Sequence, residues 1–364
     1  MSDITRKLAS VRRISEITEI PGADNIVCAT VDGWKLITQK SNNFKPNDLV
    51  CYFEIDSFLP VTEQFEWLRK SSFKSTKNLG DGFRIKTMKM RGVVSQGLIV
   101  PMDDFFEYDP RDGNYYWRDG SPDYVVEGTD LTEYLGVQKY EKPIPSNLIG
   151  RTRGNFPIFI AKTDQERLQN VYNKYKNHYE DMEFEVTLKL DGSSMTAYHY
   201  KDGENEPIDS VCSRNLDLIE TDDNLFWKVA RQYRIPETLA ALGHNVAIQG
   251  ELMGPGVQDN REQFKDHSFY LFDIWNIDLR RYLTPDERNK YIELSGLEVL
   301  HVPVLQERVK VFKEYPTLDA FLEYADSVKS INHQIAEGVV FKSYDIMGPS
   351  FKVISNKFLL KEKD

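Results

Sequence analysis

Short runs of β-branched and aromatic residues, separated by turn residues, fill the first hundred positions of the chain. The turns are signalled by Pro21-Gly22-Ala23-Asp24, Asp32-Gly33, Lys45-Pro46-Asn47-Asp48 and Gly80-Asp81-Gly82. Glycine, proline, asparagine and aspartate favour tight backbone reversals and so end strands. The runs between them predict strands over residues 9–20, 26–31, 34–38, 49–55, 83–90 and 96–100. This succession of short strands predicts a small barrel.

About five or six short strands in roughly a hundred residues are typical of an OB-fold, a barrel that also binds nucleic acid. From residue 103 to 141 the chain turns acidic and aromatic, which we interpret as an irregular extension of the barrel, followed by a linker at Lys142-Pro143-Ile144-Pro145. At 364 residues, the chain is longer than one hydrophobic core usually supports. We therefore expect two domains, residues 1–145 and residues 146–364.

Helix and strand signals alternate in the second domain. Thr163-Asp164-Gln165-Glu166 has the form of a capping box before a helix, and further helices are expected over residues 222–233, after Thr284-Pro285, and over 318–331. Most strands should pair antiparallel. The predicted fold class is α+β: an N-terminal OB-fold β-barrel followed by an antiparallel-sheet domain.

A net charge of -11 argues against a protein that coats nucleic acid indiscriminately. Between residues 69 and 91, however, the cations face a single acid, Asp81. We call these cations the basic track: Arg69, Lys70, Lys74, Lys77, Arg84, Lys86, Lys89 and Arg91. Such a segment can follow a phosphate backbone, or it can be a solvated loop face.

The three cysteines and six histidines are scattered, which indicates neither a disulfide framework nor a zinc site. No apolar run approaches the roughly 20 residues of a membrane span, and the N-terminus lacks an apolar signal core. We therefore expect a cytoplasmic or otherwise intracellular protein with no membrane partner.

A single lysine stands between two strand-like runs in the second domain. Lys189 lies near the end of the run from 184 to 190, and Asp191-Gly192 after it is typical of a hairpin turn. Apolar walls and neighbouring cations lower the pKa of a lysine from about 10.4 toward neutrality, which makes its amine a nucleophile. Lys189 is therefore a candidate for covalent catalysis; the alternative is a solvated lysine in a hairpin.

Five further stretches of this domain place charged or aromatic side chains at strand ends. Glu251 and Glu337 offer carboxylates for a hydrated divalent cation or for sugar hydroxyls, and Phe272 offers an aromatic face for a base. Cations that suit phosphates are Arg214, Lys342, Lys352 and Lys357. Together these groups are what a nucleotide phosphate site requires, although each alone also fits a solvated strand end or a core position.

In order and spacing these residues resemble motifs I, Ia, III, IIIa, IV and V of the covalent nucleotidyltransferases, the superfamily of polynucleotide ligases and capping enzymes. Residues 162–170 and motif III, Gly250-Glu251-Leu252-Met253-Gly254, look like those of RNA ligases of the T4 ligase 2 and editing-ligase type. Residues 20–26 and 52–57 look like the leading OB domain of the Deinococcus and Naegleria type of RNA ligase. The resemblance covers nearly the whole chain except the acidic segment 103–133.

The resemblance implies an ATP-dependent RNA ligase with Mg²⁺ or Mn²⁺ as its metal. The lysine would attack the α-phosphorus of ATP, AMP would pass to an RNA 5′-phosphate, and a 3′-hydroxyl would then expel AMP. Such in-line displacements depend on positioning and charge neutralisation. The expected partner is RNA, as a nicked duplex, as free ends or in an RNA/DNA hybrid, and the expected role is RNA repair by a monomer.

Carried over position by position, the resemblance assigns Lys189 as the nucleophile. Around the water shell of the metal or the ribose it places Asp191, Glu251 and Glu337. The resemblance also implies that Arg167 and Arg214 contact the ribose or the phosphates.

For the base, the resemblance implies stacking of Phe272 on adenine, and it has Lys342, Lys352 and Lys357 hold phosphates. The family often has Lys-x-Lys in motif V, but the second position here is Ile354, so either Lys352 acts alone or Lys357 substitutes. Leu188 stands where some relatives have an acid that reads adenine, so base recognition is expected from backbone groups there.

Two other functions are compatible with parts of this pattern. A DNA ligase or a capping-type guanylyltransferase shares the motifs, but its catalytic domain precedes its OB domain, the reverse of the order here. A non-catalytic RNA-binding protein on a ligase fold would need a damaged motif, whereas Lys189, Glu251 and Glu337 are all present.

Overall fold

The computed structural model describes residues 7–76, 78–140 and 151–361, which form two compact units. Unit 1 comprises residues 1–143, 168–172 and 359–364, and unit 2 comprises residues 144–167 and 173–358. The domain boundary expected between residues 145 and 146 lies outside the described residues. No helix in the described part of the chain is long and apolar enough to cross a membrane.

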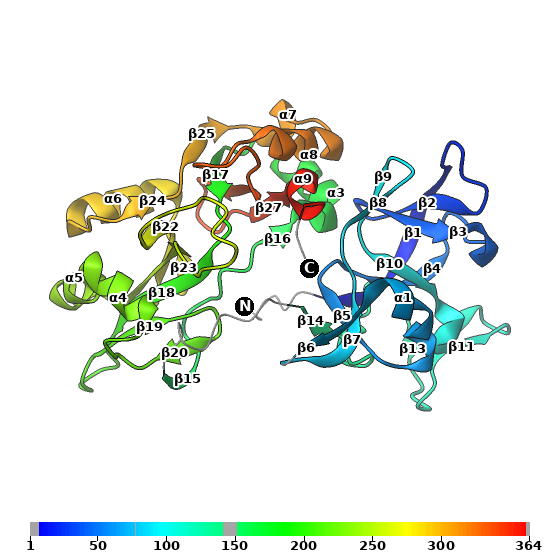
Figure 1. Cartoon of the computed structure of the whole chain (residues 1–364), viewed down its shortest axis with the longest axis horizontal. Helices are drawn as coiled ribbons and strands as arrows, with labels where there is room; N and C mark the ends of the chain where they lie inside the picture. The colour runs from blue at the N-terminus through cyan, green and yellow to red at the C-terminus, as the bar shows by residue number, and fades with distance from the viewer. Residues whose placement is uncertain (1–6, 77, 141–150, 362–364) are drawn as a thin grey trace. The chain divides into compact units, whose positions relative to one another are not determined.

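Unit 1 contains a five-stranded antiparallel sheet in the order β10-β4-β1-β2-β3 (Figure 1). The first half of β1 pairs with β4 and the second half with β2, with a bulge in between that lets the strand bend. The sheet closes into a barrel because the residues just before β10 bond to β3. Ser95 Oγ accepts from the Ile37 amide at 2.9 Å, and the Gln96 amide donates to the Lys35 carbonyl at 2.8 Å. The expected OB-type barrel is therefore confirmed. Its strands are β1 (Ala9–Glu19), β2 (Ile26–Val31), β3 (Trp34–Gln39), β4 (Leu49–Phe53) and β10 (Leu98–Pro101).

Both faces of β4 are buried, which explains its unbroken apolar run. Val50 and Tyr52 point into the barrel with Trp34, whereas Cys51 and Phe53 pack into a second core with the outer elements of unit 1. Those elements are β5 (Ser57–Pro60), β6 (Phe73–Thr76), β7 (Gly80–Arg84), β8 (Met88–Met90), β9 (Val93–Ser95), β14 (Gln138–Lys139), α1 (Arg69–Ser72) and three short 3-10 turns at Lys40–Asn42, Glu63–Leu68 and Met102–Asp104.

The acidic extension is more regular than the sequence predicts. It folds into a three-stranded antiparallel sheet of β11 (Phe106–Asp109), β12 (Asn114–Trp117) and β13 (Tyr124–Val125). Phe106 and Val125 are buried in the second core of unit 1, while Glu107 and Tyr124 are exposed. The irregular structure predicted from the acidic and aromatic composition is therefore wrong: in β11, aromatic residues alternate with acids, which suits a half-buried strand.

Unit 2 holds two sheets. The larger has the order β15-β20-β19-β18-β21-β22-β23, with β24 parallel to β22. Its apolar face, with Met195, Ile248 and Leu271, packs against α4 (Leu225–Gln232) and α5 (Ile235–Leu242), which lie beside β18 and β19 in Figure 1. Its strands are β15 (Thr152–Asn155), β18 (Ser193–Tyr200), β19 (Ile208–Cys212), β20 (Leu216–Leu218), β21 (Val246–Met253), β22 (Ser268–Asn276), β23 (Arg281–Tyr282) and β24 (Leu300–His301).

The smaller sheet of unit 2 has the order β16-β27-β26-β17-β25. An aromatic cluster that includes Phe184, Phe341 and Phe351 covers one of its faces together with Phe312 of α7 and Phe321 of α8. The elements are β16 (Glu166–Arg167), β17 (Phe184–Lys189), β25 (Val304–Val309), β26 (Gly338–Ser343), β27 (Ser350–Ile354), α7 (Val311–Glu314) and α8 (Leu318–Ser327), with α3 (Leu168–Tyr179), α6 (Pro285–Ser295) and α9 (Asn356–Leu359) completing the helices of the described chain.

The hairpin predicted at Asp191-Gly192 is wrong. β17 pairs with β25 and β26, whereas β18 pairs with β19 and β21, so the chain passes from one sheet to the other after Lys189. The Gly192 backbone also lacks the positive φ that a type I′ turn needs, and a Cβ there would lie 2.5 Å from the Leu252 carbonyl oxygen. Gly192 is required for close packing and not for a reversal.

The capping box predicted at Thr163 is also wrong, whereas the helix predicted after Thr284-Pro285 is confirmed and begins with a capping box of its own. α3 begins only at Leu168 without a side-chain cap, because Glu166–Arg167 is drawn into a parallel strand beside β27. At α6, the Thr284 side chain accepts from the Glu287 amide, and the Glu287 carboxylate accepts from the Thr284 amide.

Candidate active site

The polar faces of the two sheets of unit 2 meet around Lys189. Because side chains alternate along a strand, Lys189, Thr187 and Glu185 lie on the face of β17 opposite to the aromatic cluster. On β21, Glu251 lies on the face opposite to the apolar core of the larger sheet. The crossing from β17 to β18 brings these two faces together.

Lys189, the candidate nucleophile, forms an ion pair with Glu337. Lys189 Nζ lies 2.7 Å from both carboxylate oxygens of Glu337, which directly precedes β26. Gly338, the next residue, pairs with Lys189 across the ladder, and a Cβ there would lie 2.2 Å from the Val353 carbonyl oxygen, so only glycine fits. Glu251 Oε1 accepts from the Gly192 amide at 3.0 Å. The structure thus brings Lys189, Glu251 and Glu337 together.

The surroundings of Lys189 differ from those expected. Burial alone would lower its pKa, but Glu337, Glu251 and Asp191 outweigh that effect and raise the pKa above its ordinary value. The prediction of a lysine with a lowered pKa among cations is therefore wrong for this state of the protein, because the neighbours are acids. Burial, together with the charges of Glu337 and Asp191, raises the pKa of Glu251 to about 8 despite the nearby ammonium.

These acids suit a hydrated divalent cation. Within the described residues, no group of three or more His, Cys, Asp or Glu side chains is arranged to hold a metal ion directly. Burial, and after it the charges of Glu337 and Asp191, raise the pKa of Glu251, and a divalent cation would relieve the repulsion among these carboxylates. Mg²⁺ commonly keeps several of its waters in protein sites. Asp191, Glu251 and Glu337 therefore fit a metal contacted through its water shell.

Phe272 occupies a β-bulge beside these charges. Gln249 pairs with Asp273 and Gly250 pairs with Leu271, so Phe272 is the extra residue of β22. Its half-buried ring lies 5.6 Å from Lys342 Nζ. Bulges re-aim a side chain next to active sites, and an aromatic face presented in this way can stack on a base.

Lys342, which is predicted to hold a phosphate, is buried. Its Nζ lies 2.5 Å from Asp273 Oδ1 and donates to the Phe272 carbonyl at 2.5 Å. Burial lowers the pKa of Lys342 and raises that of Asp273. In this arrangement Lys342 supports Phe272 and is already engaged by protein groups.

Of the two predicted arginines, Arg167 is buried on β16, in register with Lys352 of β27. Arg214, which follows β19, is partly exposed, and its Nη2 donates to both oxygens of Asp164 at 2.7 and 3.0 Å. Asp164 is an ion-pair partner of Arg214 that the sequence did not predict, since the pattern at residues 163–166 placed it inside a helix.

The two candidate motif V lysines differ in position. Lys352 lies in register with Val340, which pairs with Thr187, so it shares the face of the sheet that carries Lys189. Lys357 lies at the start of α9, and both its backbone amide and its Nζ donate to Asp326, at 3.0 and 3.2 Å. Only Lys352 is placed on the nucleophile's face.

Leu188 packs on the opposite side of β17. Its side chain is 3% exposed and belongs to an apolar cluster with Leu190, Met253 and Val302. Phe272 packs against the same cluster, and the recognition of the base by backbone groups at Leu188 stays a prediction.

The basic track is only partly exposed. Arg84 is 3% exposed and stacks over Tyr140 at 4.2 Å, and Arg69 pairs with Glu66. Lys77 lies outside the described residues. Lys70, Lys89 and Arg91 are exposed, whereas Lys74 and Lys86 are partly buried.

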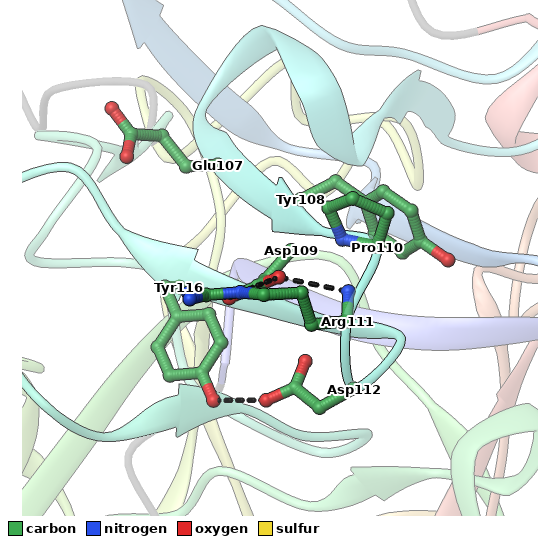
Figure 2. A pocket seen from close by; sticks show the side chains of 7 residues that line it. All are labelled: Glu107, Tyr108, Asp109, Pro110, Arg111, Asp112 and Tyr116. Atoms are coloured by element: carbon green, nitrogen blue, oxygen red, sulfur yellow. Dashed lines mark hydrogen bonds and ion pairs between the residues drawn. The ribbon is translucent and has the colours of Figure 1, made fainter.

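A pocket of about 720 Å³ lies at the turn between β11 and β12 in unit 1 (Figure 2). Four of its side chains pair with one another: Arg111 Nη2 donates to Asp109 at 2.5 Å, and the Tyr116 hydroxyl donates to Asp112 at 2.6 Å. We assign it no part in the site around Lys189.

Comparison with known proteins agrees with this geometry. A family model described as RNA ligase matches residues 182–354, and one described as an OB-fold domain matches residues 8–102. A point mutant of Naegleria gruberi RNA ligase in its apo form is 41% identical over 98% of each chain, with a TM-score of 0.85.

A second mutant of that ligase, solved with ATP and Mn, is 41% identical over 99% of this chain and 100% of its own, also at a TM-score of 0.85. The same ligase solved with PPi is 41% identical over 98% of this chain and 99% of its own, with a TM-score of 0.83. The comparison with curated proteins finds no match. Identity of this level over nearly the full length of both chains shows that this protein belongs to the RNA ligase family.

Proposed function

We propose that this RNA ligase uses ATP and Mg²⁺ or Mn²⁺ to seal RNA 3′-hydroxyl and 5′-phosphate ends through a covalent lysyl-AMP and an RNA-adenylate. The observation that carries the proposal is the position of Lys189 Nζ, 2.7 Å from Glu337 and among the charges of Glu251 and Asp191. The ATP and Mn of a Naegleria gruberi ligase structure and the PPi of another support the same chemistry.

In the first step Lys189 Nζ attacks the α-phosphorus of ATP. A P–N bond forms, the bond to the bridging oxygen breaks, and pyrophosphate leaves in line with the attack. The amine must first lose the proton that its acidic neighbours stabilise. Asp191, Glu251 and Glu337 would hold a divalent cation, whose positive charge would lower the pKa of Lys189. Glu337 keeps the nitrogen oriented through its hydrogen bond.

In the second step a 5′-phosphate oxygen of RNA attacks the adenylate phosphorus, and the P–N bond breaks to return Lys189. In the third, the 3′-hydroxyl oxygen attacks the 5′-phosphate and AMP leaves. Phe272 stacks on the adenine, and Arg167 and Arg214 bind the ribose or the phosphates. Because neutralised charge stabilises such transition states, we assign the motif V role to Lys352 on the nucleophile's face and not to Lys357.

The RNA itself is bound partly by the exposed residues of the basic track in unit 1, whose cations can follow a phosphate backbone. We expect a nicked duplex, with RNA or an RNA/DNA hybrid at the break, and a role in RNA repair. The residues that carry the chemistry come from one unit of one chain, so we expect a monomer. A supply of ATP places the reaction inside the cell.

The test is adenylylation with α-³²P-labelled ATP and Mg²⁺, read on a denaturing gel. Wild type should carry a label that Lys189→Ala loses while staying folded, because this partly exposed lysine contributes little core packing. Lys201→Ala, at an exposed lysine on the loop after β18, is the matched control and should label normally. A labelled Lys189→Ala protein would refute the assignment of the nucleophile.

Two substitutions of substrate separate the alternatives. Labelled GTP should give no adduct, whereas a guanylyltransferase would prefer it. A panel of nicked RNA, DNA and hybrid duplexes should show sealing where RNA ends meet, and sealing confined to all-DNA nicks would instead identify a DNA ligase.

A further inference from the structure

A buried ion pair joins β17, the strand of Lys189, to α6, and neither of its residues is among those predicted for the site. Arg288 of α6 donates from Nη2 to Glu185 Oε2 at 2.7 Å and from Nη1 to Glu185 Oε1 at 3.0 Å. Both side chains are 1% exposed. Burial alone would raise the pKa of Glu185, but the hydrogen bond and charge of Arg288 outweigh it and lower the pKa.

Stability alone is a poor explanation for such a pair. Removing two charges from water costs several kcal/mol, and an apolar pair of similar volume often does as well or better. Arg288 Nη1 also reaches the Phe272 carbonyl, at 3.5 Å.

That carbonyl belongs to the extra residue of the β-bulge, which has no cross-strand partner on β21. Two cations converge on it: Lys342 Nζ at 2.5 Å and Arg288 Nη1 at 3.5 Å. Glu185 holds Arg288, and Asp273 holds Lys342. Glu185 and Lys342 are register partners on β17 and β26 of the smaller sheet. Through Arg288 and Lys342, this sheet is therefore hydrogen-bonded to the bulge in β22 of the larger sheet.

We propose that Arg288, oriented by Glu185, is a positioning residue that fixes the bulge of β22 and thereby holds the Phe272 ring in place for the adenine of ATP. The inference rests on the proposed function, in which Phe272 stacks on the base. Arg288 touches neither ATP nor the reacting atoms. Its effect should therefore fall on the binding of ATP and not on the rate of transfer to Lys189.

The experiment measures KM for ATP and the rate at saturating ATP in the adenylylation assay. The main variant is the double replacement Glu185→Leu with Arg288→Met, which leaves no unpaired buried charge. Arg288→Lys keeps the charge but has a single nitrogen, which cannot serve both Glu185 and the Phe272 carbonyl. Circular dichroism and thermal unfolding check that each variant is folded. Arg281→Met, which removes an ion pair to Glu287 of the same helix, is the matched control.

We expect both the double variant and Arg288→Lys to raise KM at least tenfold, with the saturating rate within threefold of wild type, and Arg281→Met to leave KM unchanged. Phe272→Leu should raise KM similarly, and adding it to the double variant should have little further effect, because both changes act through one ring.

A folded double variant with the KM of wild type would show that the pair is merely structural and would overturn the proposal. Fully additive effects with Phe272→Leu would also overturn it. If the double variant does not fold, the result for Arg288→Lys decides in the same way. Failure of the proposed function is distinguishable, because wild type itself would then form no adduct.

Discussion

His301 gives the most quantitative prediction, because its environment holds it neutral. It lies on β24, where Nδ1 donates to the Val302 carbonyl at 2.6 Å, and Nε2 is buried with no hydrogen-bond partner in the described structure. Burial, followed by the charge of Arg288, lowers its pKa from about 6.5 to about 4. Protonating the ring would bury a second positive charge beside Arg288.

The direction of the effect on stability follows from linkage. The unfolded chain binds a proton at His301 below about pH 6.5, whereas the folded protein does so only below about pH 4. The stabilising contribution is therefore complete above about pH 6.5 and is lost as the pH falls toward 4. The difference in pKa corresponds to about 3 kcal/mol at the limit and to about 2 kcal/mol at pH 5.

Urea denaturation of wild type and His301→Gln at pH 7 and pH 5 tests this magnitude. Wild type should lose about 2 kcal/mol more of its free energy of unfolding between these pH values than the variant, because glutamine does not titrate. All other titrating groups are common to both proteins, so the comparison isolates His301. An equal loss in both proteins would refute the reasoning, as would an NMR titration of the His301 ring with a midpoint near 6.5.

Three further changes follow from the structure. Replacing the exposed lysines of the basic track by glutamate should weaken RNA sealing and reduce its dependence on salt while sparing self-adenylylation; loss of the adduct would instead place the track at the nucleotide site. Gly338→Ala should lower the midpoint of thermal unfolding and abolish the adduct, because its Cβ would collide with the Val353 carbonyl, and a variant with wild-type stability would contradict this packing. Thr284→Ala should cost about 1 kcal/mol in denaturant unfolding by breaking the capping box of α6, with KM for ATP unchanged.

Local sequence patterns were enough to predict most strands of the barrel and the residue types of the candidate site. The strands of unit 1 up to β4 begin where turn residues end, and Thr284-Pro285 starts α6, because these signals act within a few residues. The same local logic failed at Thr163 and at Asp191-Gly192. There a strand partner more than a hundred residues away and a neighbouring sheet outweighed the local preference for a cap or a hairpin.

The residue types of the candidate site were therefore predictable from the sequence: one lysine, two glutamates and an aromatic residue in or beside strands. Their electrostatic state was not, since the pKa values of Lys189 and Glu251 depend on burial and on carboxylates, Glu337 among them, that the two sheets bring together. Nothing in the polar helix α6 marks Arg288 as special either. Only the packing of that helix against β17 and the bulge of β22 decides what it touches, because burial and charge interactions depend on distance in space and not on separation along the chain.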